Sequence, residues 1–159
     1  MTTTTKNETT IEADPKVPTI KIVREFDATP DRVFKAWVDP ELIVQWLGPN
    51  GTTMKLDRWD ATTGGAWKYH ETSGDDPQSF YGSFHEVREN ERIVQTFTWD
   101  GYPDGVALET ITFEALEGGR TRVTTLDVVD TFEGRDMIVS SGMDTGVIEG
   151  YQRLDALLA

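Results

Sequence analysis

Residues 52–129 contain six short stretches rich in β-branched and aromatic residues, with turn residues between them at intervals of about 8–12 residues. The turn segments are short, such as Gly64-Gly65 and Glu117-Gly118-Gly119. Parallel strands need a crossover of roughly a dozen residues or more, so connections this short restrict neighbouring strands to antiparallel pairing. Strands are therefore expected near residues 52–59, 66–72, 79–88, 92–99, 107–116 and 120–129.

One more strand and two short helices are predicted before this region. From Thr19 to Phe26 apolar residues alternate with polar ones, as in a strand. The segments Thr29-Pro30-Asp31 and Asp39-Pro40-Glu41 each combine a capping residue, a proline suited to the first helical turn and a carboxylate for its positive end. Two tandem helices joined at Asp39 are the expected result.

The C-terminal segment has the period of a helix. Its apolar residues recur three or four positions apart, and three glycines lie on one line beside them. We expect a helix of roughly 18 residues or more, with the glycines packed closely against the sheet. The apolar residues are Met143, Val147, Tyr151, Leu154 and Leu158, and the glycines are Gly142, Gly146 and Gly150.

These elements make an α+β fold in one domain. A chain of 159 residues is of single-domain length. Residues 1–18 are rich in threonine and charge, with Ile11 and Val17 as the sizeable apolar residues after Met1, and are predicted to be a disordered tail. The ordered domain is predicted to span residues 19–159, with seven antiparallel strands.

Several segments resemble one known family. They include Trp46-Leu47-Gly48-Pro49, the double-glycine strand start Gly64-Gly65-Ala66-Trp67, and the closing helix from Gly142 to Leu154. From Thr19 to Ala159 the chain resembles the proteins named after the activator of the ninety-kilodalton heat-shock-protein ATPase. That family belongs to the START-like (SRPBCC) superfamily, together with polyketide cyclases and birch-pollen-allergen relatives.

The resemblance implies a helix-grip fold, in which a curved antiparallel sheet wraps around a long C-terminal helix and encloses a cavity for a small molecule. Two positions depart from the family pattern. Thr62 stands where relatives often have arginine, and Val147 stands where they often have tryptophan. Because valine is much smaller than tryptophan, we expect a larger cavity beneath Val147 and contact between Val147 and the ligand.

Composition argues against several other classes of function. There are no cysteines, and His70 and His85 lie in different predicted strands, so we expect no metal and no cofactor. The net charge of −13 opposes binding to nucleic acid and to anionic membranes. No apolar run approaches the ~20 residues of a membrane span, and the N-terminus lacks a signal-peptide pattern, so a cytoplasmic location is expected.

The aromatic residues of the strands are the main candidates for a ligand site. Pairs two positions apart, such as Trp67 with Tyr69, share one face of a strand. Facing inward, they form either a filled core or the wall of an apolar pocket, and the resemblance favours the pocket. The predicted pocket residues are Trp46, Trp67, Tyr69, Phe84, Phe97, Trp99, Ile111, Phe113, Asp127, Met143 and Val147.

No complete catalytic site is visible. Glu86 and Asp127 lie on otherwise apolar strand faces, where a carboxylate could act as an acid or base. The favoured interpretation is that each is paired with Arg24 or Arg92, or lies at a solvated strand end. The leading hypothesis is binding of a small apolar or aromatic molecule, linked to stress response or secondary metabolism. The alternatives are a cyclase- or aromatase-type enzyme that uses Glu86, Asp127 or Tyr69, and a chaperone-interacting module.

Overall fold

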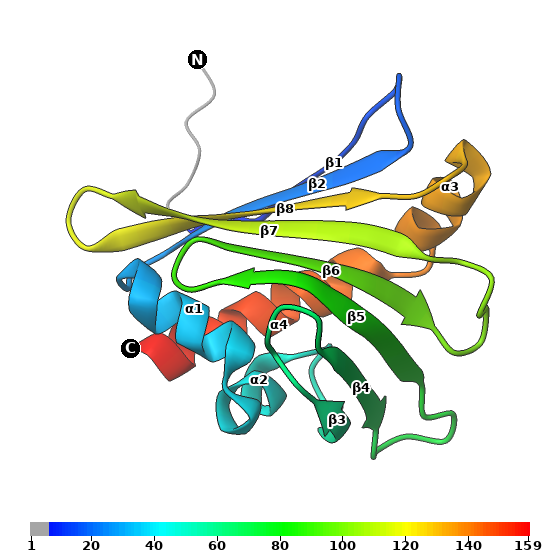
Figure 1. Ribbon diagram of the computed structural model, residues 1–159, viewed down its shortest axis with the longest axis horizontal. Coiled ribbons are helices and arrows are strands. Elements are labelled where there is room, and N and C mark those ends of the chain that lie inside the picture. Colours follow the sequence, from blue (N-terminus) through cyan, green and yellow to red (C-terminus); the bar gives the residue numbers. More distant parts are fainter. Residues whose placement is uncertain (1–6) are drawn as a thin grey trace.

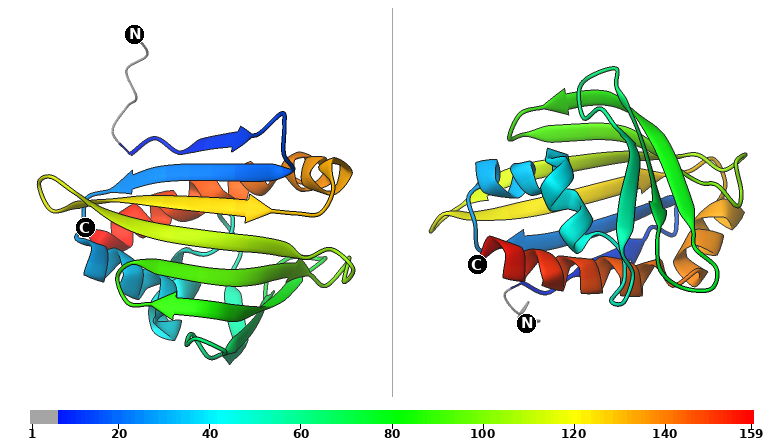
Figure 2. Two further views of the ribbon diagram at one scale, coloured as in Figure 1. Left: turned by 45° about the horizontal axis from the view of Figure 1, so that its top comes forward. Right: turned by 90° about the horizontal axis from the view of Figure 1, so that it is seen from below.

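The computed structural model, which describes residues 7–159, shows one curved antiparallel sheet with helices on its concave side (Figures 1 and 2). All neighbouring strands are antiparallel, in the order β1-β2-β8-β7-β6-β5-β4-β3. The strands are β1 (Thr10–Ala13), β2 (Thr19–Phe26), β3 (Met54–Trp59), β4 (Ala66–Glu71), β5 (Ser79–Arg88), β6 (Arg92–Trp99), β7 (Ala107–Leu116) and β8 (Arg120–Val128).

The concave face of the sheet holds α4 and the tandem helices α1 and α2, as Figure 2 shows. Asp39 caps α2 as expected, because its carboxylate accepts a hydrogen bond from the backbone N–H of Glu41 at 2.8 Å. Thr29 precedes α1, but its side chain makes no capping hydrogen bond within the described residues. The helices are α1 (Pro30–Val38), α2 (Pro40–Trp46), α3 (Phe132–Ser140) and α4 (Met143–Leu158).

The α+β helix-grip arrangement is confirmed, but the prediction of seven strands is wrong by one. The eighth strand, β1, lies within residues 1–18, which were predicted to be a disordered tail. It pairs with β2, where Ile11 lies opposite Ile22 and packs against the core. Backbone pairing along the edge of β2 does not depend on a long apolar pattern, which explains why the strand was missed. Residues 1–6 of the predicted tail lie outside the described residues.

The C-terminal helix is shorter than expected. It has 16 residues rather than 18 or more, and a separate helix, α3, precedes it. Gly142 lies between the two with a φ of 88°, in the left-handed region that a glycine adopts without steric cost. This residue therefore breaks the helix that the apolar period alone would have continued.

The glycines of α4 pack against α2 and the turn after it, not against the sheet as predicted. A Cβ atom on Gly150 would lie 2.8 Å from the carbonyl oxygen of Trp46. Gly146 is less crowded, since a Cβ there would be 3.6 Å from Pro49. Arg153 of α4 adds a hydrogen bond to the carbonyl oxygen of Gly48. The close approach sets the position of α2, and hence of Trp46, above the sheet.

Candidate functional site

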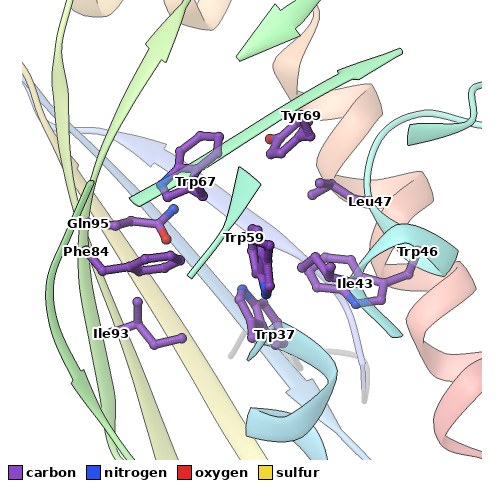
Figure 3. Close-up of a pocket in the computed structure, with 10 residues that line it drawn as sticks. All are labelled: Trp37, Ile43, Trp46, Leu47, Trp59, Trp67, Tyr69, Phe84, Ile93 and Gln95. Carbon is purple, nitrogen blue, oxygen red and sulfur yellow. The ribbon is translucent and has the colours of Figure 1, made fainter. Parts of the chain in front are cut away.

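A cavity of about 60 Å³ lies between α1 and α2 on one side and strands β3–β6 on the other (Figure 3). Six of its ten lining residues are aromatic, and Gln95 alone carries a polar amide. The lining residues are Trp37, Ile43, Trp46, Leu47, Trp59, Trp67, Tyr69, Phe84, Ile93 and Gln95. The site is therefore apolar with one polar end, as small-molecule sites usually are.

The sheet wall of the cavity is built around Trp67. Its ring stacks on that of Tyr69, with centroids 5.1 Å apart and an interplanar angle of 19°. The indole lies across Gly82, where an added Cβ would come within 2.8 Å of the ring. Gly82 thus leaves room that the Trp67 side chain fills.

The helix wall is held by two indole N–H groups. Trp46 donates to the carbonyl oxygen of Ala36 at 3.0 Å, and Trp59 donates to that of Val38 at 2.7 Å. Trp46 also packs against Trp37, with ring centroids 4.7 Å apart. Since both donors are taken by the backbone of α1, these indoles present mainly their carbon surfaces to the cavity.

The cavity lies nearest the surface between α2 and β3. Leu47 and Trp59 are only partly buried, whereas Trp37, Ile43 and Trp46 beneath them are buried. In Figure 3 these five side chains lie on the helix side of the group, opposite Gln95, Phe84 and Trp67. Gln95, on the opposite side, is also only partly buried.

Four of the predicted pocket residues line this cavity: Trp46, Trp67, Tyr69 and Phe84. Phe97 lies beside them, with its ring centroid 5.5 Å from that of Trp67. The predicted alternatives of a filled core and an open cavity both hold in part, because most aromatic side chains pack together and leave only a small space.

The remaining predicted residues lie elsewhere. Ile111 and Phe113 are buried in the core, where Phe113 packs against Phe34 and Trp37. Trp99 is 45% exposed and donates its N–H to Gln78. Met143 and Val147 are partly buried against the core and are not among the residues that line this cavity.

Six lining residues were missing from the predicted set: Trp37, Ile43, Leu47, Trp59, Ile93 and Gln95. The signal for several of them was present in the sequence. Trp37, Ile43 and Leu47 lie on the apolar faces of the two tandem helices, and Gln95 alternates with Ile93 and Phe97 along one strand. Gln95 was passed over because its side chain is polar.

The predicted carboxylates differ in their surroundings. Glu86 is paired with Arg88 at 3.0 Å and with Arg92 at 3.6 Å, so pairing with arginine is confirmed for this residue. For Asp127 the prediction of pairing with an arginine is wrong. Asp127 lies opposite Glu109 on β7, and burial, followed by the charge and hydrogen bond of Glu109, raises its pKa well above the ordinary value.

No helix within residues 7–159 has both the length and the apolar character to cross a membrane. Among the same residues there is no group of three or more histidine, cysteine or acidic side chains arranged to hold a metal ion. His70 instead lies 2.7 Å from the carboxylate of Asp57 near the surface. The absence of a bound metal or cofactor from the functional protein stays a prediction.

Solved structures from several bacteria share this fold. Protein Ms6760 of Mycobacterium smegmatis is 23% identical with a TM-score of 0.86, covering 96% of this chain and 98% of its own. A protein from Rhodobacter sphaeroides is 26% identical with a TM-score of 0.83, covering 94% and 97%. Protein CV1439 of Chromobacterium violaceum is 30% identical with a TM-score of 0.78, covering 89% and 96%. No curated protein matches the chain.

Similarity to these structures shows the fold, and a match to a family model shows the protein family. The family model describes the activator of Hsp90 ATPase homolog 1-like proteins and matches residues 27–159, from the end of β2 to the C-terminal residue. That range includes all ten residues that line the cavity. The chain therefore belongs to the family of activator of Hsp90 ATPase homolog 1-like proteins.

Proposed function

We propose that the protein binds a small, largely apolar ligand in the cavity beneath α2. The observation that carries the proposal is a space of about 60 Å³ walled mainly by aromatic rings. Apolar walls with a single amide, that of Gln95, suit a ring-bearing ligand that has one polar group.

The size of the cavity bears on how a ligand would enter. An engineered apolar cavity of about 150 Å³ holds benzene, so a ring-sized ligand needs more room than this resting cavity provides. The additional volume would come from outward movement of Leu47 and Trp59, the partly exposed residues at its edge. The buried sheet wall formed by Trp67 and Phe84 would stay in place.

Two alternative functions have less support. A cyclase-type enzyme would need Glu86, Asp127 or Tyr69 to touch the ligand, and of these only Tyr69 lines the cavity. Burial, followed by the charges of Glu109 and Glu71, raises the pKa of Tyr69, which makes its phenol a poorer proton donor. Contact with a chaperone rests on the family name, and no described surface of the chain favours it.

Thermal unfolding in the presence of toluene, indole and naphthalene tests the proposal. A ligand that binds only the folded state raises the unfolding temperature with its concentration. Leu47→Trp should abolish the rise by filling the opening, whereas Gln45→Trp, which adds the same side chain at an exposed position of the same helix, should retain it. If none of the three probes raised the unfolding temperature of the wild type, the proposal would be wrong.

A further inference from the structure

A row of three polar side chains crosses the concave face of the sheet beside the cavity. The strand register places Asp127 of β8 opposite Glu109 of β7, and Glu109 opposite Gln95 of β6. The row is flanked by the buried apolar residues Ile20 on β2 and Phe84 on β5. Because Gln95 also lines the cavity, the row connects the buried carboxyl of Asp127, through the half-buried Glu109, to the ligand site.

The two carboxyls lie in different surroundings. Asp127 is only 7% exposed, and burial, followed by the charge and hydrogen bond of Glu109, raises its pKa well above the ordinary value, whereas Glu109 is only half-buried. The other oxygen of Asp127, Oδ1, is buried and has no partner within the described residues. Arg24, a buried cation on the same face of the sheet, is engaged by the carboxylate of Asp155.

A hydrogen bond to Glu109 fixes the orientation of the Gln95 amide. Gln95 Nε2 donates to Glu109 Oε1 at 2.8 Å. Because the amide nitrogen faces the carboxyl oxygen, the amide oxygen is left as an acceptor. Figure 3 shows the end of the Gln95 side chain turned toward the other lining residues.

The donors in the cavity wall are limited. Trp46 and Trp59 give their N–H groups to backbone carbonyls. Trp67 Nε1 is buried without a partner in the part of the chain that the structure describes, so it remains available to a ligand acceptor. At Gln95 a ligand instead meets an acceptor, Oε1, with the carboxyl group of Glu109 behind the amide. Both features favour a donor, and most of all a cationic one.

We propose that the cavity selects apolar, ring-bearing ligands whose polar group donates a hydrogen bond to Gln95, with amines preferred over alcohols and carboxylates excluded. Glu109 is the positioning residue that sets this preference through Gln95. The inference rests on the proposed function, since it assigns the ligand class of the same cavity.

The test is a binding series measured by tryptophan fluorescence with 2-phenylethylamine, 2-phenylethanol, phenylacetate and ethylbenzene. These probes share one ring and differ in the polar group. We expect the amine to bind about tenfold or more tightly than phenylacetate, since hydrogen bonds to charged groups are the stronger ones. Glu109→Gln should reduce that ratio to about threefold or less, because the carboxyl group that orients Gln95 is gone.

Three further variants serve as controls for the effect of Glu109→Gln on the amine preference. Asp127→Asn should preserve the amine preference, because Glu109 keeps its carboxyl group and a hydrogen-bond donor beside it. Glu117→Gln removes the same charge from an exposed turn and should change nothing. Gln95→Leu removes the acceptor, so it should equalise the amine and ethylbenzene even if Glu109→Gln fails to fold.

The outcomes separate the two proposals. Equal binding of ethylbenzene, amine and carboxylate to the wild type would overturn the selectivity and leave the binding function intact. Binding of none of the four probes would overturn both. An amine preference that survived in Gln95→Leu would also contradict the inference, because it would arise from another group.

Discussion

Asp127 and Glu109 face each other on adjacent strands and share a hydrogen bond, although both side chains are carboxylic acids. Such a pair is stable only while it holds a proton. The buried member, Asp127, has its pKa raised by burial first and by Glu109 second. The fold therefore favours the protonated form of Asp127, two strands away from Gln95 at the polar end of the cavity.

The raised pKa of Asp127 makes a pH-dependent contribution to stability. In the unfolded chain Asp127 ionises above its ordinary pKa of 3.8, whereas in the folded chain it stays protonated to a higher pH. Between these two values the folded state binds more protons, so this group's contribution to the free energy of unfolding falls as pH rises. Asp127→Asn, which mimics the protonated form, should remove that loss.

The measurement is urea unfolding of the wild type and Asp127→Asn from pH 4 to pH 8. The variant should gain on the wild type by up to about 1.4 kcal/mol per pH unit within the window above 3.8. The ionisation of other groups cancels in the difference. A difference that stayed constant with pH would show that Asp127 ionises alike in both states.

Two glycines of α4, four residues apart, should respond oppositely to alanine. Gly146→Ala places a Cβ 3.6 Å from Pro49, an ordinary contact, and should stabilise the protein by about 0.5–1 kcal/mol through helix propensity. Gly150→Ala places it 2.8 Å from a backbone oxygen of Trp46 and should destabilise by about 1–3 kcal/mol. Denaturant titration of both variants measures the difference, and a stable Gly150→Ala would mean that α4 does not approach α2 so closely.

The N-terminal segment should contribute measurably to stability. The buried Arg135 donates from Nη1 to the carbonyl oxygens of Asp14 and Thr19 at 2.8 and 2.9 Å, which fixes the turn between β1 and β2. Deleting residues 1–17 should therefore lower the free energy of unfolding by more than about 1 kcal/mol relative to deleting residues 1–9, which leaves β1 in place. Equal stability of the two truncations would support the disordered tail that the composition predicts.

Most of the fold could be predicted because its signals are local. The alternation in β2 and the proline-acid starts of α1 and α2 depend on neighbouring residues alone. Edge strand β1 was missed because its order comes from pairing with β2 and from Arg135, more than a hundred residues away. Long-range contacts of this kind leave little mark on the segment itself.

The site was predicted less well for a related reason. Trp67, Tyr69 and Phe84 were found because inward-facing aromatic residues alternate along their strands. Trp59 was missed because its place in the wall depends on a hydrogen bond to Val38 across the sheet–helix gap. Gln95 was missed because only aromatic and apolar side chains were sought on its strand, although it alternates with Ile93 and Phe97 there.

Nuclear Overhauser measurements with bound 2-phenylethylamine show whether the cavity beneath α2 is the ligand site. We expect contacts from the phenyl ring to the side chains of Trp59, Phe84 and Ile93, and from the methylene next to the amine to Gln95. Contacts confined to surface residues such as Tyr102, Phe132 or Met137, or the absence of any contact to the cavity residues at saturating probe, would contradict it.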